Sequence, residues 1–371
     1  MGGSAHHFCR LTPGDGVNVE RLLLALDFGG TKLSAGLIAS GERRWRAHRQ
    51  VLSFGGTNAE LDLSTMMSLA RDLLGGTAPA AIGVSFGGPV KAAEGVVLLS
   101  HHVPGWEDFP LRDWLQDRFG VPAGVDNDAN VAALGEWRFG AGQRSRSLLY
   151  VTVSTGVGGG WVLDGRIYHG ADSLAGEIGH MTVRPGGPVC ACGRRGCLEA
   201  VAAGPAIARR ARERLLAAQT SEVSEDFGSL AGEPQQFYTT PGALLRQLVG
   251  GDVGTVTAHH VSQAAEAGDE LAQQVLEEAA HALGFGIGCA IVLMNPERVV
   301  VGGGVAKSGE RYFEAVRAAA RANVLQGMSV DIVPAALGDD APLWGAIALA
   351  EDQIRKGISD QGISDWSFLV P

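Results

Sequence analysis

The apolar residues of this chain fall into short strings that end in glycine-rich turns. Strings of this length and composition predict buried β-strands within 22–38, 80–90, 147–163, 297–307 and 330–336. Two of them, 22–38 and 147–163, are divided by a glycine turn and therefore predict strand–turn–strand units. Because the same unit occurs early and in the centre of the chain, we expect a fold with two similar halves.

Apolar residues spaced three and four apart predict helices between the strands. These helices are expected at about 61–74, 129–139, 205–218, 260–267, 270–294, 312–324 and 341–356. The alternation indicates an α/β fold, and 371 residues are enough for two domains. We place one domain at 21–125 and a larger one at 126–344, and we expect the helix at about 345–356 to pack back on the first.

Composition and charge narrow the class of protein. Hydrophobic residues make up 46% and charged residues 19%, as in ordinary globular chains, and the net charge of −10 argues against a nucleic-acid partner. The N-terminus has no apolar core of signal-peptide length, and the apolar run 289–294 is too short to span a bilayer. We expect a cytoplasmic protein without a membrane partner, in which 1–20 form a loose arm and 221–240 a loop or lid insertion.

A group of cysteines predicts a metal site. Cys190, Cys192 and Cys197 lie within eight residues, and His180 lies ten residues before the first of them. Three thiolates and one imidazole complete a tetrahedral Zn²⁺ site with no open position, so we expect structural zinc that braces a glycine-rich loop. If the segment from Glu177 to His180 is helical, the two side chains share a face and the loop forms one wall of a binding site. The alternative is a set of free or redox-active thiols.

Three glycine turns suit a nucleotide. The first, 27–32, reads Asp-Phe-Gly-Gly-Thr-Lys, in which backbone N–H groups and a threonine hydroxyl can face an anion. Asp27, at the end of a strand, is the expected ligand of the Mg²⁺ that accompanies a nucleotide. The second turn, 154–160, repeats the pattern, and the third, 302–304, would admit a base and ribose. The alternative for the first turn is ordinary hairpin chemistry.

A carboxylate at the start of the helix 129–139 is the candidate general base. Residues 126–130 read Asp-Asn-Asp-Ala-Asn, which is more polar than a helix cap requires. Asp128 can take the proton of a substrate hydroxyl as its oxygen attacks phosphorus. The alternative is that Asp128 only caps the helix. His102 and Trp106 either line a cleft or belong to a surface loop.

Six segments in order resemble one family. LALDFGGTK, VDNDAN, STGVGGG, AGEIGH, CACGRRGCLE and VVVGGGV, between about 22 and 354, are similar to motifs of the ROK family (repressors, open reading frames and sugar kinases). The resemblance implies a two-domain actin-like (ribonuclease H-like) fold with an interdomain active-site cleft. It also implies an ATP- and Mg²⁺-dependent kinase that phosphorylates glucose or an N-acetylhexosamine, at O6, as a homodimer or homotetramer.

The same resemblance implies roles for individual residues. Asp128 would be the catalytic base, and the sugar would be bound by Gly88, His102, Asn127, Asp128, Glu177, His180 and Glu199. The nucleotide would be bound by Asp27, Gly29, Gly30, Thr31, Lys32, Thr155, Gly156, Gly302, Gly303 and Gly304. The zinc ligands would be His180, Cys190, Cys192 and Cys197. His102 stands where many relatives have asparagine, which leaves the sugar preference open.

Two other functions compete with the kinase. The family also includes sugar-responsive repressors, but these need a helix-turn-helix of about 60 residues before the first glycine turn. About 20 residues precede it here, and they are not basic, so we do not expect DNA binding. An ATP-driven chaperone or filament protein of the wider superfamily is the third hypothesis, and the Asp128 and zinc motifs argue against it.

Overall fold

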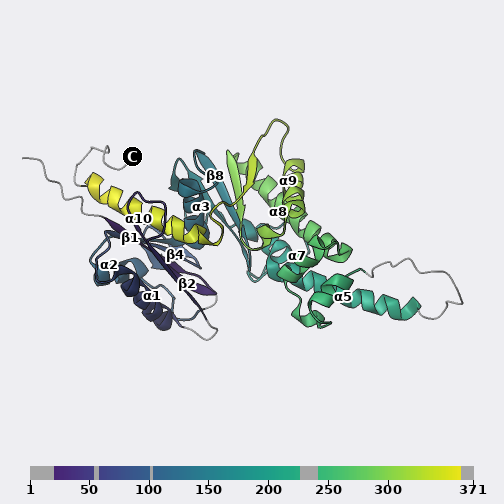
Figure 1. The fold of residues 1–371 in the computed structure, drawn as a ribbon. Helices are drawn as coiled ribbons and strands as arrows, with labels where there is room; N and C mark the ends of the chain where they lie inside the picture. The colour runs from purple at the N-terminus through teal and green to yellow at the C-terminus, as the bar shows by residue number, and fades with distance from the viewer. Residues whose placement is uncertain (1–20, 54–57, 101–102, 226–240, 361–371) are drawn as a thin grey trace, which may run out of the picture.

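The computed structural model describes residues 21–53, 58–100, 103–225 and 241–360, which contain two five-stranded β-sheets and their covering helices (Figure 1). The first sheet contains β1 (Leu22–Phe28), β2 (Lys32–Ala39), β3 (Ala47–Leu52), β4 (Ala81–Phe86) and β7 (Ala123–Asn127). The second contains β8 (Ser147–Val153), β9 (Val157–Leu163), β10 (Arg166–Ile167), β11 (Arg298–Gly302) and β12 (Asp331–Pro334). A small hairpin pairs β5 (Val90–Lys91) with β6 (Val96–Val97).

The two sheets have the same topology. Their strand orders are β3-β2-β1-β4-β7 and β10-β9-β8-β11-β12. In the first sheet β3, β2 and β1 pair antiparallel, β4 pairs parallel with β1, and β7 pairs parallel with β4. In the second sheet β10, β9 and β8 pair antiparallel, β11 pairs parallel with β8, and β12 pairs parallel with β11. The prediction of an α/β fold with two similar halves is therefore confirmed, because each strand–turn–strand unit opens one of the sheets.

Alternate residues of the first sheet face two different layers of helix. Leu24, Leu26 and Phe28 pack toward α1 (Ala59–Leu74) and α2 (Leu111–Phe119). Leu23 and Ala25 face the opposite way and pack against α10 (Ala341–Asp360). A period of two with both faces covered explains why the strands read as continuous apolar strings.

The second sheet is covered in the same manner. Leu148 and Tyr150 of β8 pack against α3 (Asp128–Phe139) on one face. Leu149 and Val151 face the larger core, which is closed by α5 (Gly204–Glu225), α7 (Ala258–Glu266), α8 (Glu270–Met294) and α9 (Glu310–Ala322). The remaining elements are α4 (Leu198–Ala202), α6 (Ala243–Leu248), η1 (Ile178–His180), η2 (Val253–Thr255), η3 (Val305–Lys307) and η4 (Gly338–Asp340).

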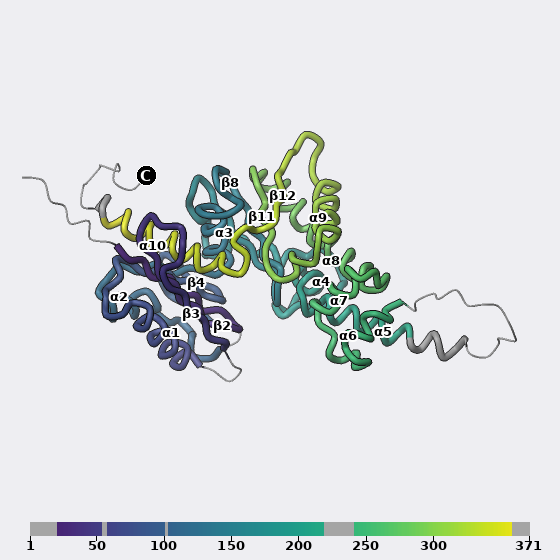
Figure 2. The backbone as a smooth tube through the Cα atoms, viewed as in Figure 1, coloured from purple at the N-terminus to yellow at the C-terminus, as the bar shows by residue number. Residues whose placement is uncertain are grey.

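The C-terminal helix returns to the sheet formed by the N-terminal strands. In Figures 1 and 2 the yellow α10 lies along the purple β1 and beside β4. α10 also crosses α3, where the backbone at Gly345 meets the Val131 carbonyl so closely that a side chain would not fit. The helix that begins with Asp128 is thus held between the two sheets.

Helix α8 is, among the residues described, the one helix long and apolar enough to cross a membrane. The most apolar 18-residue stretch of this helix is 61% buried inside the protein. The helix contributes Leu276, Leu283 and Ile287 to the larger core. Burial on this scale is typical of the central helix of a globular domain.

Some expectations differ from the structure. Helix α5 continues to Glu225, so the segment 221–225, expected to begin a loop, is helical. The rest of that expected insertion, and the expected N-terminal arm at 1–20, lie outside the described residues. Trp106 does not line a cleft: it is 1% exposed and packs edge-on against Phe28, Phe86 and Phe109 in the first core.

Candidate active site

Asp27 lies at the carboxyl end of β1, just before a tight turn. Gly29 N donates to Lys32 O at 3.1 Å, and this bond closes the turn that leads into β2. Asp27 is 5% exposed and accepts a hydrogen bond from Ser85 Oγ, at the end of the neighbouring β4, at 2.7 Å. Burial and, to a lesser degree, the nearby carboxylate of Asp128 raise the pKa of Asp27 to about 7, against the opposing effects of Ser85 and Lys32. A buried carboxyl group in this position suits a divalent cation.

The β7–α3 junction places Asp128 at the start of a helix. Asn127 is the N-cap: its Oδ1 accepts from Ala129 N at 3.0 Å and from Asn130 N at 3.4 Å. Its Nδ2 donates to Gly88 O at 3.0 Å and to Asp128 Oδ1 at 3.1 Å. The amide of Asn127 is therefore engaged in holding the junction together.

Asp128 has one carboxylate oxygen that its neighbours do not use. Ala129 N and Asn127 Nδ2 both donate to Oδ1, at 2.8 and 3.1 Å, while no hydrogen bond within the described part of the chain reaches Oδ2. Burial and, to a lesser degree, the charge of Glu177 raise the pKa of Asp128 to about 6, against the hydrogen bonds from Ala129 N and Asn127 Nδ2 that lower it. A carboxylate with this pKa is ionised at neutral pH and still basic enough to accept a proton.

The second glycine turn connects β8 and β9 and lies beside the same helix. Ser154 N donates to Gly156 O at 2.8 Å, and Thr155 is exposed at the tip. A Cβ built on Gly158 would stand 3.3 Å from the Cβ of Ala129, next to Asp128. Both glycine turns thus flank the start of α3, one from each sheet.

Glu199, the first acidic residue of α4, closes the end of this turn. Its Oε2 accepts from Val157 N at 3.1 Å and would be 2.7 Å from a Cβ on Gly156. The third glycine turn adjoins from the other side. Gly303 has φ +91°, and a Cβ there would lie 2.3 Å from Val153 O, so this position accepts only glycine.

The predicted metal ligands form a cluster. One donor atom from each of His180, Cys190, Cys192 and Cys197 lies within 4.8 Å of the others. Cys190 Sγ is 3.7 Å from His180 Nδ1, and Cys192 Sγ is 3.6 Å from Cys197 Sγ. Tetrahedral zinc with Zn–S bonds of ~2.3 Å separates its sulfur ligands by about 3.7 Å. The four residues therefore fit a Zn²⁺ ion.

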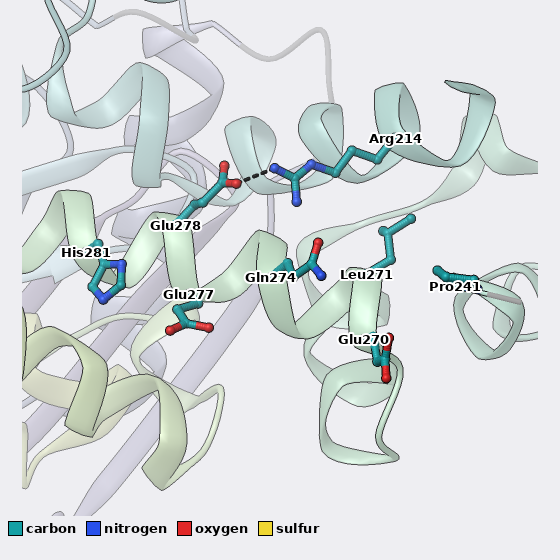
Figure 3. A pocket seen from close by; sticks show the side chains of 8 residues that line it. All are labelled: Arg214, Pro241, Glu270, Leu271, Gln274, Glu277, Glu278 and His281. Carbon is teal, nitrogen blue, oxygen red and sulfur yellow. Dashed lines mark hydrogen bonds and ion pairs between the residues drawn. The ribbon is translucent and has the colours of Figure 1, made fainter. Parts of the chain in front are cut away.

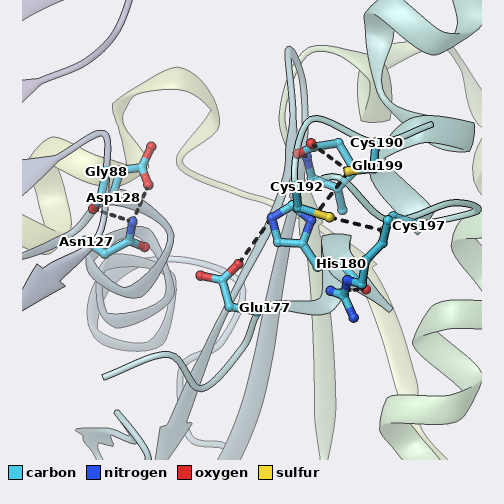
Figure 4. Close-up of polar contacts among 11 residues, drawn as sticks. Gly88, Asn127, Asp128, Glu177, His180, Cys190, Cys192, Cys197 and Glu199 are labelled. Carbon is cyan, nitrogen blue, oxygen red and sulfur yellow. Dashed lines mark hydrogen bonds and ion pairs between the residues drawn. The ribbon is translucent and has the colours of Figure 1, made fainter. Parts of the chain in front are cut away.

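The Cys/His cluster adjoins the candidate sugar-binding residues. Glu177 precedes η1, and its Oε2 is 3.8 Å from His180 Nε2, the ring nitrogen that faces away from Cys190. Glu199 Oε1 lies 3.8 Å from Cys190 Sγ. Figure 4 shows the Glu177 carboxylate between Asp128 and the Cys/His cluster. Hydrogen bonding from Arg194 N–H lowers the pKa of Cys192 and favours its thiolate, whereas burial raises the pKa of Cys190 and of Cys197.

The structure therefore brings together the residues predicted from separate motifs, with one exception. His102 lies outside the described residues. Sequence reasoning missed Ser85, which contacts Asp27, and His169, which contacts Asp126. Ser85 is signalled only by its place at the end of a strand next to Asp27, and His169 has no motif to identify it.

Two hollows in the surface lie elsewhere. One, of about 490 Å³, lies between α5 and α8 and is lined by Arg214, Glu270, Gln274, Glu278 and His281 among others, with an Arg214–Glu278 ion pair across it (Figure 3). The other, of about 420 Å³, is lined by Arg184, Arg209, Arg210 and Glu213 and by 185–188. Neither contains a residue of the glycine turns or the α3 start.

Comparison with known proteins gives a consistent family. The ROK family model matches residues 23–353. A glucokinase of Halalkalibacterium halodurans is 38% identical over 285 residues, covering 74% of this chain and 79% of that one. The crystal structure of a ROK family glucokinase from Streptomyces griseus, in complex with glucose and AMPPNP, superimposes with a TM-score of 0.73 at 32% identity and covers 89% of this chain and 99% of that one.

A regulator is also similar. A xylose repressor of Caldicellulosiruptor bescii is 30% identical over 270 residues, which cover 72% of this chain and 61% of the repressor. Kinases and repressors of one family thus both resemble this chain. The match over nearly all of 23–353, together with the paired sheets of actin-like type, shows that the chain belongs to the ROK family.

Proposed function

We propose that this protein is an ATP-dependent hexose kinase that transfers the γ-phosphoryl group to glucose or an N-acetylhexosamine, at O6. The observation that carries the proposal is the position of Asp128, whose unshared Oδ2 lies at a helix start flanked by two glycine turns and faced by Glu177. The glucokinase relatives, including the one described with glucose and AMPPNP, support it.

In this mechanism the protein positions two substrates and moves one proton. Glu177, His180 and Glu199 offer acceptors and donors for adjacent sugar hydroxyls. Asn127 and the Gly88 carbonyl border the same space. Asp128 takes the proton of the attacking hydroxyl, so that its oxygen becomes nucleophilic as it meets phosphorus.

The glycine turns would hold the nucleotide. Backbone N–H groups at 30–32 and 155–156 would donate to phosphate oxygens, with Thr31 and Thr155 adding hydroxyls and Lys32 a charge. The turn 302–304 would lie against the adenosine. Mg²⁺ held near Asp27 would offset phosphate charge, in agreement with the raised pKa of that buried carboxyl group.

The Cys/His cluster would hold a structural Zn²⁺ ion. Zinc would fix the loop 180–199, which carries both His180 and Glu199, and would orient the imidazole so that Nε2 faces the sugar site. Reduced thiols serving as ligands agree with a cytoplasmic location, which we also propose. From the family we propose a homodimer or homotetramer, without a nucleic-acid or membrane partner, and two domains at 21–125 and 126–344.

An ADP-release assay across hexoses and N-acetylhexosamines tests the proposal. We expect ADP release to depend on a sugar, with one sugar phosphate formed for each ADP released. ATP turnover that is equal with and without every sugar would contradict the kinase.

The second candidate is a sugar-binding regulator without kinase activity, favoured by the similarity to the xylose repressor. A gel-shift assay with genomic fragments distinguishes the two. Sugar-dependent DNA binding in a protein that releases no ADP would support the regulator.

A further inference from the structure

A partly buried contact joins the two sheets beside the candidate base. Asp126, in β7 of the first sheet, exposes only 3% of its side chain, and its Oδ2 lies 2.6 Å from Nε2 of His169. His169 follows β10 of the second sheet, 43 residues later. Because a carboxylate only accepts, Nε2 must carry the proton, and the short distance is typical of a charge-assisted hydrogen bond.

The other oxygen of Asp126 holds the turn that carries Asp128. Oδ1 accepts from Asn127 N at 2.8 Å and from Asn130 Nδ2 at 3.1 Å, which places one bond on each side of Asp128. The carboxylate of Asp126 is therefore fully engaged within the protein. Its role is to fix the backbone around the base, and it has no oxygen left to offer a substrate.

His169 begins the segment that carries Glu177. Tyr168 N donates to Trp161 O at 2.9 Å and fastens this segment to β9. His169 O accepts from Ala175 N at 3.0 Å, which closes the loop just before Glu177. A loop closed at both ends transmits a displacement of His169 to Glu177.

We propose that His169 and Asp126 form a positioning ion pair that sets how the sugar-facing Glu177 lies relative to the base Asp128. The proposal rests on the proposed kinase function, since it assigns the pair a role in that same site. Neither member touches a substrate, so both are positioning residues.

The charges around His169 give the pair a defined pH dependence. The hydrogen bond to Asp126 raises the pKa of His169, whereas burial and the charge of Lys356 on α10 lower it. Asp126 and Lys356 are the charged groups, among those described, that act on the ring. Since the folded pKa is raised, the contribution of the pair is complete below the ordinary pKa of about 6.5 and is lost as pH rises through the folded value.

The test compares three variants of the full chain by steady-state kinetics at pH 6.5 and pH 9. His169→Ala is expected to lower kcat/KM for the sugar about tenfold at pH 6.5, because a small misplacement of reacting groups is costly. KM for ATP is expected to stay within about twofold, because the glycine turns have no bond to the pair. His169→Gln can still donate to Asp126 but carries no charge, so it is expected to recover only part of the loss at pH 6.5, and its kcat/KM relative to His169→Ala should not change with pH. His281→Ala, an exposed histidine on α8 far from the site, is the matched control.

The pH comparison uses the ratio of wild type to His169→Ala, in which the ionisation of Asp128 cancels. The ratio of sugar kcat/KM, wild type over His169→Ala, is expected to be closer to 1 at pH 9 than at pH 6.5. Equal sugar kcat/KM for wild type and His169→Ala at pH 6.5, an equal rise in KM for both substrates, or a ratio unchanged with pH would each overturn the positioning ion pair. A wild-type protein that phosphorylates no sugar is a different result, because it contradicts the proposed function before any variant is compared.

Discussion

The crossing of α10 and α3 at Gly345 can be tested by adding one methyl group. A Cβ at Gly345 would lie 1.7 Å from the carbonyl oxygen of Val131 and 2.7 Å from the side chain of the same residue. The carbonyl belongs to a helix backbone, so no side-chain rotation relieves the overlap. Overpacking of this kind costs about 1–3 kcal/mol or more, against which alanine gains up to about 1 kcal/mol of helix propensity over glycine. We expect Gly345→Ala to lower the free energy of unfolding by about 1–2 kcal/mol or more.

Gly357→Ala on the same helix is the matched control. No heavy atom lies within 4 Å of a Cβ at Gly357, so only the helix propensity changes. This variant is expected to be up to about 1 kcal/mol more stable than wild type. Urea unfolding followed by circular dichroism measures the free energy of unfolding of both variants. Relative to wild type, this free energy should fall for Gly345→Ala and rise for Gly357→Ala. Gly345→Ala that is as stable as Gly357→Ala would refute the close helix crossing.

Three further predictions concern the site. Because the base must be ionised, kcat/KM for the sugar is expected to fall as pH drops through about 6, the pKa of Asp128 in the ligand-free protein, and a flat profile of kcat/KM from pH 5 to 8 would contradict this. A buried acid with a raised pKa lowers the free energy of unfolding as pH rises from about 4 to about 7, so Asp27→Asn should stabilise the ligand-free protein at pH 8 by at most about 4 kcal/mol. The same variant should bind Mg-ATP more weakly. Thermal unfolding should show a difference in stability between Asp27→Asn and wild type that is larger at pH 8 than at pH 4, and equal stability of the two proteins at pH 8 would refute the prediction. Metal analysis should find one zinc per chain in wild type and much less in Cys197→Ser. In Cys197→Ser we expect KM for the sugar to rise more than KM for ATP. Wild-type protein that is fully active without zinc would contradict the metal site.

Much of the secondary structure could be predicted from the local pattern of apolar and polar residues. Two strings split by glycine predicted the hairpins that open each sheet, because side-chain alternation and turn chemistry are local properties. Helix α8 was predicted with its observed bounds because helical spacing begins at Glu270 and Asn295-Pro296 stops it, and the structure adds Asp269 as its N-cap. Helix α5 was predicted too short, since polar residues beyond 218 do not by themselves end a helix.

Contacts between distant segments could not be derived in the same way. Trp106 lies in a polar stretch, yet three aromatic rings bury it, and only the folded chain brings Phe28 and Phe86 beside it. The pairing of Asp126 with His169 depends on how one sheet meets the other. Motifs identify residues whose chemistry is typical of a family, whereas a bond between a strand end and a remote loop leaves no local signal.

The measurement that tests the central claim most directly is phosphorylation by Asp128→Asn, compared with its affinity for sugar by calorimetry. Asparagine keeps the size of the side chain and the oxygen that accepts from Ala129 N, but it cannot take a proton. We predict an unchanged fold, sugar affinity close to that of wild type and a turnover at least about 10²-fold lower. Turnover near the wild-type rate would contradict the assignment of Asp128 as the base and, with it, this account of the site.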